Sequence, residues 1–255
     1  MRSIVDWEFS DIFIVSYPKS GVTWLCLILA NILNILKADN RRIDYFSVHD
    51  YIPDIHSNPQ RIIGLEPPRI IKTHEKFKEW SKRISKKGHG IIYPRVIHLV
   101  RDGRDSMVSY FHYINAMKTH KIDLNHFLKN KIGCQDCWAQ HTTEWTDNNI
   151  IDTRKKHIIQ YESLRMDPKG EIKQLMNFIG IDVSDEIIIK SIDLADIKII
   201  QNFEKLYGSD VQYTDKSYMF ARKGTTGINE KEYKKITDNY YDQFDKIFKK
   251  YNYSK

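Results

Sequence analysis

The sequence predicts an α/β fold in which a mostly parallel sheet is covered by helices on both faces. Two observations support this. Short β-branched segments alternate with longer helical patterns along the 255 residues, and neither a repeat nor a Pro/Gly-rich linker divides the chain. Such alternation implies βαβ units, whose parallel sheets are buried on both sides. With 41% hydrophobic residues the chain can bury a sizeable core. We therefore expect one domain over residues 1–255.

Each expected element follows from its apolar pattern. Short apolar, β-branched runs predict strands at residues 12–15, 69–73, 95–100 and 157–161. Apolar residues at helical spacing predict helices at 23–37, from Asp105 onward, and at 168–179, 185–195 and 230–251. The helix at 23–37, the helix from Asp105 and the pair at 168–179 and 185–195 each follow a predicted strand, as the crossovers of a parallel sheet require.

Charge and cysteine content narrow the class of protein. Forty Lys and Arg against 33 Asp and Glu give a net charge of +7, which favours anionic partners: nucleotides, nucleic acid or acidic lipid. The most apolar segment, residues 25–36, is far shorter than the ~20 apolar residues of a membrane helix, and the N-terminus lacks the apolar block of a secretory signal. Cys26, Cys134 and Cys137 cannot form a disulfide framework, so the lone CxxC is interpreted as two reduced thiols. We expect a cytoplasmic protein.

The loop between the first strand and the first long helix is a candidate anion site. It comprises residues 17–24 (YPKSGVTW). In parallel sheets, ligands bind beyond the carboxyl ends of strands, where helix N-termini present N–H groups. Gly21 permits close backbone approach, Ser20 and Thr23 offer hydroxyls, and Lys19 adds a positive charge. The loop is not the GxxxxGK[ST] of nucleoside triphosphatases, and an ordinary turn capped by Ser and Thr is the alternative.

Four ordered motifs resemble the cytosolic-type sulfotransferases, which use 3′-phosphoadenosine 5′-phosphosulfate (PAPS). Residues 17–24 resemble the 5′-phosphosulfate loop of that family, and residues 68–74 (PRIIKTH) its strand with the catalytic His. Residues 101–110 (RDGRDSMVSY) resemble its 3′-phosphate segment, and residues 222–227 (RKGTTG) its C-terminal loop. The resemblance spans most of the chain and implies the P-loop-like nucleotide-binding sulfotransferase fold.

The resemblance also implies the catalytic residues. His74 would be the general base that removes a proton from the acceptor, and Lys19 would neutralise charge on the leaving oxygen of adenosine 3′,5′-bisphosphate (PAP). Lys72, two residues before His74, would face the same side and contact the sulfuryl group. Ser109 would hold Lys19 away from the donor until the acceptor binds. No metal is implied, because Lys and Arg supply the cations.

Donor binding is expected from loops that follow the strands. Trp24 resembles the residue that stacks on adenine, Tyr161 the one at the adenine edge, and Arg101 with Ser109 the pair at the 3′-phosphate. The full implied set is Lys19, Ser20, Gly21, Val22, Thr23, Trp24, Arg101, Ser109, Tyr161, Phe203, Phe220, Arg222, Lys223 and Gly224.

Several of these residues could instead have a purely structural role. Trp24 and Tyr161 could pack in the core. Arg101 could form an ion pair with Asp102 or Asp105, and residues 222–223 could be charged side chains exposed to solvent.

The sequence departs from the family pattern in three places. Val22 stands where a Thr is usual, which removes one hydroxyl and predicts weaker or altered donor binding. Residues 75–77 (EKF) replace the usual Leu-Pro on the acceptor side. The C-terminal dimerisation motif is not recognisable in residues 231–241, so the oligomeric state is not predicted.

We therefore predict a PAPS-dependent sulfotransferase that acts on a hydroxyl or amine of a small organic acceptor, without nucleic acid or membrane partners. A nucleotide-dependent phosphotransferase is disfavoured by the missing GxxxxGK[ST] loop and by the lack of an evident carboxylate pair for magnesium. A non-enzymatic module that binds nucleic acid or another polyanion is disfavoured because the basic residues lie in compact loops after strands.

Overall fold

The computed structural model describes residues 7–39, 41–85, 93–129, 137–147, 149–208, 213–215, 217–221, 224 and 230–253. Within these residues four strands form one sheet in the order β2-β1-β3-β4. The strands are β1 (Ile12–Ser16), β2 (Ile70–Thr73), β3 (Arg95–Val100) and β4 (Lys156–Gln160).

All three strand pairings are parallel. Ile12 lies opposite Ile70 on one side and Arg95 on the other, and Val96 lies opposite Lys156. Strand β1 is therefore hydrogen-bonded to β2 on one side and to β3 on the other. From β1 the chain first crosses to β2 at one edge of the sheet, and it then returns past β1 to form β3 on the opposite side. In such sheets the two neighbouring loops part at the carboxyl edge and leave a crevice, which is the usual ligand site.

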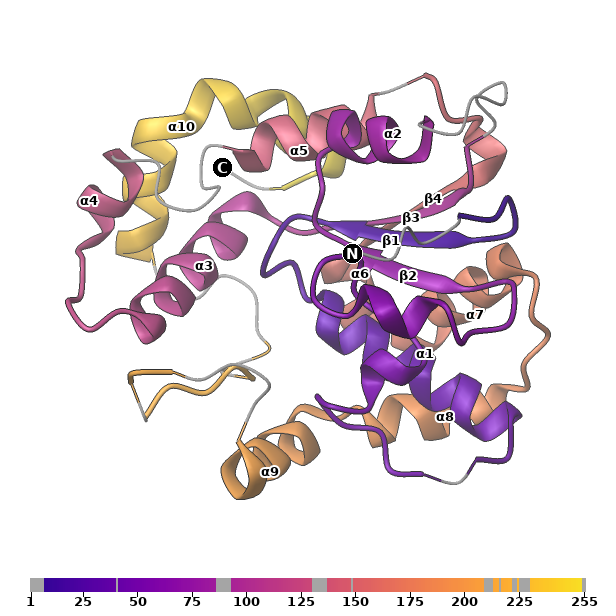
Figure 1. Ribbon diagram of the computed structural model, residues 1–255. Coiled ribbons are helices and arrows are strands. Elements are labelled where there is room, and N and C mark those ends of the chain that lie inside the picture. Colours follow the sequence, from indigo (N-terminus) through magenta and orange to yellow (C-terminus); the bar gives the residue numbers. More distant parts are fainter. Residues whose placement is uncertain are drawn as a thin grey trace.

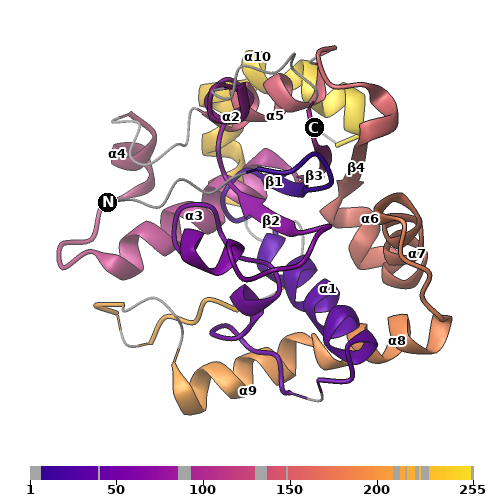
Figure 2. The ribbon, with the colours of Figure 1, turned by 45° about the vertical axis from the view of Figure 1, so that its right-hand side comes forward.

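The helices form layers on both faces of the sheet. Figures 1 and 2 show α2, α5 and α10 on one face and α1, α7 and α8 on the other, with α3 and α4 beside the first group. The bounds are α1 (Val22–Leu36), α2 (Phe77–Ser85), α3 (Gly103–Met117), α4 (Leu124–Lys129), α5 (Cys137–Thr146), α6 (Tyr161–Met166), α7 (Pro168–Ile179), α8 (Asp185–Leu194), α9 (Ile197–Tyr207) and α10 (Glu230–Tyr251).

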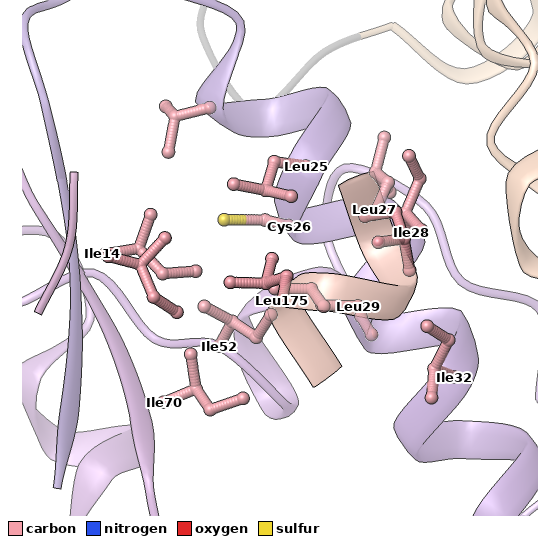
Figure 3. Packing of buried hydrophobic residues seen from close by; sticks show 14 of the residues in the cluster. Ile14, Leu25, Cys26, Leu27, Ile28, Leu29, Ile32, Ile52, Ile70 and Leu175 are labelled. Carbon is pink, nitrogen blue, oxygen red and sulfur yellow. The ribbon is translucent and has the colours of Figure 1, made fainter. Parts of the chain in front are cut away.

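The alternation of side chains along β1 explains the two layers. Ile12 and Ile14 face the cluster under α1, α7 and α8, whereas Phe13 and Val15 face Trp80 of α2 and its neighbours. Figure 3 shows the first cluster, with Cys26 of α1 directed toward Ile14 of the sheet. Burial raises the pKa of the Cys26 thiol to about 12, so this side chain is protonated and behaves as a small apolar group.

The predicted fold class is confirmed: a single α/β domain on a parallel sheet. One helix start needs correction. Helix α3 begins at Gly103 and not at Asp105, because the Asp102 carboxylate accepts a hydrogen bond from the Arg104 backbone N–H at 2.8 Å and caps the helix there. The predicted pair of thiols lies partly outside the described residues, since Cys134 is not among them, while Cys137 begins α5.

Candidate functional site

One cavity of about 440 Å³ opens at the carboxyl edge of the sheet. Residues that follow each of the four strands line it: Lys19 after β1, His74 after β2, Arg101 after β3 and Tyr161 after β4. The predicted residues that line the cavity are Lys19, Gly21, Val22, Thr23, Trp24, Lys72, His74, Arg101, Ser109, Tyr161, Phe220 and Gly224.

Gly21 shapes the anion loop. Its φ is +93°, and a Cβ placed there would lie 2.5 Å from Tyr161 Cδ2, so only glycine fits. Gly21 is also the N-cap of the 15-residue α1, and Gly21, Val22 and Thr23 all line the cavity. The positive end of a helix dipole therefore points at the cavity, which favours an anion.

Lys19 lies between two aromatic rings. Its Nζ is 3.5 Å from the centroid of Phe220 and 4.7 Å from that of Tyr113. Both are cation–π distances. The resemblance implies that Ser109 restrains Lys19, and Ser109 lines the same cavity as Lys19.

Arg101 joins the loop after β1 to helix α3. Its Nη1 donates to the Lys19 carbonyl at 3.1 Å, and its Nη2 is 3.4 Å from Asp105 Oδ2. Its guanidinium stacks over the Tyr161 ring at 4.4 Å. The ion pair with Asp105, one of the alternatives weighed from sequence, is present and holds the guanidinium at the cavity wall beside Ser109.

His74 is oriented as a proton acceptor. Its Nδ1 lies 2.8 Å from the Ser16 carbonyl, and because a carbonyl only accepts hydrogen bonds, Nδ1 is assigned the proton of the neutral ring. Nε2 then carries the lone pair. Burial lowers the pKa of His74 to about 4, with help from the positive charge of Lys72, so the ring is neutral near pH 7.

Lys72 and Asp54 form an ion pair in the cavity wall, with Nζ 3.0 Å from Oδ2. Burial opposes ionisation of Asp54, but Lys72 and two backbone N–H groups outweigh it and hold the pKa of this carboxyl well below its usual range. The pair is therefore charged on both sides.

Trp24 and Tyr161 meet edge to face, with ring centroids 6.0 Å apart. Arg165 lies over the Trp24 ring at 5.3 Å, and all three residues line the cavity. The face of one such aromatic ring can hold a nucleobase by stacking.

Comparison with known proteins agrees with this geometry. A family model described as a sulfotransferase domain matches residues 9–254. The chain belongs to the sulfotransferase family.

Its relatives match over most of its length. Mouse sulfotransferase 1B1 is 28% identical over 94% of this chain and 82% of its own. Bovine sulfotransferase 1A1 is 27% identical over 89% of this chain and 79% of its own. The solved structure of mouse sulfotransferase SULT7A1 complexed with PAP covers 98% of this chain and 91% of its own, with a TM-score of 0.68 at 21% identity. The predicted enzyme class, a PAPS-dependent sulfotransferase, is confirmed.

Two residues predicted for the sulfotransferase site do not line the cavity. Ser20 is buried, with its Oγ 3.5 Å from Ser106 Oγ, and does not line the cavity. Phe203 packs against Phe46 and Tyr207 and lines a separate small pocket. Arg222 and Lys223 lie outside the described residues.

Other lining residues of this sulfotransferase carried no sequence signal. Asp54, Tyr113 and Arg165 belong to none of the four motifs, and only their position in the fold brings them to the cavity. Val22, which stands where the family usually has a Thr, is 4% exposed, belongs to the apolar cluster under α1 and also lines the cavity.

Among the residues that the structure describes, no group of three or more His, Cys, Asp and Glu side chains is arranged to hold a metal ion. No helix within these residues is long and apolar enough to cross a membrane.

Proposed function

We propose that this cavity holds both substrates of the sulfotransferase: PAPS against the residues after β1, β3 and β4, and a hydroxyl or amine of a small organic acceptor beside His74. The observation that supports this most is the convergence of a helix N-terminus, four Lys and Arg side chains and a neutral imidazole on one cavity. The donor is a polyanion, which needs the first two features, and acceptor activation needs the third.

The residues present fit the donor. The backbone at Gly21 leaves no room for a Cβ, as expected where the chain approaches a ligand or ring closely. Lys19 and Arg101 supply positive charge for the sulfated and phosphorylated ends, and Trp24 with Tyr161 supplies aromatic surface for adenine. Arg222, Lys223 and Gly224 are proposed to complete the 3′-phosphate site; of these only Gly224 is described, and it lines the cavity.

The proposed reaction is an in-line displacement at sulfur. His74 Nε2 takes the proton of the acceptor hydroxyl or amine as the acceptor oxygen or nitrogen forms its bond to sulfur. The bond between sulfur and the bridging phosphate oxygen breaks, its electron pair stays on that oxygen, and PAP leaves. Lys19 neutralises the charge that develops on the leaving oxygen, and Lys72 contacts the oxygens of the transferred group.

Transfer of labelled sulfate from PAPS tests the two main roles. We expect His74→Ala to lower kcat by roughly 100-fold or more, as for loss of a general base. We expect Lys19→Ala to lower it by roughly 100- to 1,000-fold, as for loss of a charge-stabilising group. Retained turnover in His74→Ala would contradict the assignment of the base.

Binding of PAP tests the donor site separately. If Arg101 binds the 3′-phosphate, PAP should raise the melting temperature of the protein far more than adenosine 5′-phosphate does. Arg101→Gln should reduce this difference, because it removes one of the positive charges proposed to contact the 3′-phosphate. Equal shifts for both nucleotides in the wild-type protein would contradict the site.

The acceptor wall favours a small molecule with apolar or aromatic surface. Tyr45, Val48, Tyr110 and Tyr113 line the same cavity as His74 and Lys72. We propose an acceptor of this character. A cytoplasmic location and the domain limits of 1–255 stay predictions, and the family match spans residues 9–254.

A further inference from the structure

A segment outside the four strands lies along the free edge of β2. The backbone N–H of Lys72 donates to the Pro53 carbonyl at 2.9 Å, and the N–H of Ile55 donates to the Lys72 carbonyl at 3.0 Å. This parallel bridge places Asp54 directly opposite Lys72. The backbone therefore fixes the position of the Asp54 side chain relative to the strand that leads to His74.

The Asp54 carboxylate is held from two sides. Oδ1 accepts the backbone N–H groups of His56 and Ser57 at 2.8 and 3.1 Å, and Oδ2 lies 3.0 Å from Lys72 Nζ. Asp54 is only 5% exposed. Most of its lone pairs are thus already used, which argues against a direct role in binding a cationic acceptor.

The Lys72 ammonium, unlike the Asp54 carboxylate, keeps hydrogen-bonding capacity for a ligand. It carries three N–H donors on a flexible four-carbon stem, and Asp54 engages one side of it. Lys72 still lines the cavity. A rigid carboxylate behind a flexible cation fixes the position of the cation and leaves its other donors for a substrate.

We propose that Asp54 is a positioning residue for sulfuryl transfer, which holds the Lys72 ammonium toward the transferred group and offsets its charge next to His74. This inference rests on the proposed function, in which Lys72 contacts the transferred group and His74 is the base.

The charges of Lys72 and Asp54 also act on the pKa of His74. On its own side of the sheet His74 faces Lys72, Asp54 and His56; the Ser16 carbonyl of β1 accepts from its Nδ1, and His141 of α5 lies on the other face. Lys72 lowers the pKa of His74 and Asp54 raises it. Removing the two charges one at a time should therefore move the His74 pKa in opposite directions.

The kinetic test is Asp54→Asn, which keeps the shape and removes the charge. We expect kcat to fall roughly 10- to 100-fold, because a misplaced group costs about this much. The Kd for PAP should stay within about twofold, because PAP lacks the transferred group. Asp54→Glu, which restores the charge on a longer side chain, should recover part of the loss.

Asp11→Asn is the matched control. Asp11 is a fully buried carboxylate that pairs with Arg69, with Oδ2 2.7 Å from Nη2. Asp11 precedes β1 and Arg69 precedes β2, so this pair lies at the end of the sheet opposite to the cavity. The Asp11→Asn variant should lose stability but keep kcat. An Asp54→Asn protein that is folded and turns over at the wild-type rate overturns the inference. Wild-type protein that transfers no sulfate from PAPS overturns the proposed function instead.

A titration of His74 by NMR covers the case in which Asp54→Asn does not fold. Lys72→Met should raise the His74 pKa above the wild-type value. The double variant Asp54→Asn with Lys72→Met contains no unpaired buried carboxylate and should lower it again. The same pKa in the single and double variants would show that Asp54 does not act on the base, and would overturn the inference.

Discussion

Gly21 shows how one residue can set the geometry of the anion loop. Its positive φ and the 2.5 Å approach that a Cβ would make to the Tyr161 ring leave no room for any side chain. A larger residue must displace either the loop or the aromatic wall, and both line the cavity.

We expect Gly21→Ala to destabilise the protein by about 1–3 kcal/mol, the usual cost of a strained backbone position, and to weaken PAP binding at least tenfold. Urea unfolding and calorimetric titration with PAP measure the two effects. Gly64→Ala is the control, because a Cβ at Gly64 meets nothing within 4 Å. Similar losses in both variants would contradict this role for Gly21.

The site residues that were predicted from sequence are those that belong to a short sequence motif. Lys19, His74 and Arg101 each belong to one, and each lines the cavity. Asp54 and Tyr113 were not predicted, because each acts through a partner distant in sequence: Asp54 faces Lys72 across a strand edge, and Tyr113 faces Lys19 from α3. No pattern around either residue encodes that partner.

At the level of elements, a buried cap and ion pair fix the start of α3. Asp102 caps the helix and pairs with Arg104 at 2.5 Å, and both side chains are buried. The guanidinium of Arg104 also lies 4.6 Å from the centroid of the Phe248 ring of α10. The cap thus ties the loop after β3 to the C-terminal helix.

Asp102→Ala should cost about 3–5 kcal/mol of unfolding free energy, because it removes one partner of a buried ion pair along with a cap. Asp152→Ala is a close match: Asp152 caps a short helix and pairs with Arg154, two residues on, but on the surface, where Arg154 is 88% exposed. It should change stability little, because exposed pairs are screened by water. Equal losses in urea unfolding would show that burial at Asp102 is not decisive.

The strands were predicted more completely than the helices that cover them. All four strands of the described sheet had been expected within one or two residues. Helices α2, α4, α5, α6 and α9 were not predicted. Helices of this length are marginal on their own and depend on tertiary contacts that local sequence does not encode. Trp138 and Trp145 of α5, which are fully buried and seven residues apart, were the one periodic signal available there.

For the whole molecule, buried histidines link stability to pH. Burial lowers the pKa of His74 to about 4 and that of His141 to about 3, and it also lowers the pKa of His98. The unfolded chain binds protons at these residues near pH 6.5, whereas the folded chain does not. Above pH 6.5 these imidazoles are neutral in both states, and the free energy of unfolding does not depend on them. Between pH 6.5 and the lowered pKa values the unfolded state binds more protons, so the free energy of unfolding falls as the pH falls.

We expect the melting temperature to fall steeply between pH 6.5 and 4. Each of these histidines adds up to about 1.4 kcal/mol per pH unit to the slope. His141→Leu should flatten the slope of unfolding free energy against pH by close to one proton, whereas the exposed His120→Leu should leave it unchanged. Unfolding in urea at a series of pH values measures both slopes, and an unchanged slope in His141→Leu would contradict the assignment.

The parallel bridge between residues 53–55 and β2 has a consequence for how this enzyme can change. The loop that contains Gly21 follows β1, which is hydrogen-bonded to β2 on one side and to β3 on the other. A shift of β1 would therefore break both strand pairings. The wall next to His74 is instead joined to the outer side of β2 by two backbone hydrogen bonds around Lys72, and its buried residues, such as Tyr51 and Ile52, pack in the cluster under α1. Substitutions at exposed positions of residues 41–66 leave Asp54, this packing and both pairings of β1 in place, so a library aimed at new acceptors should be confined to those positions.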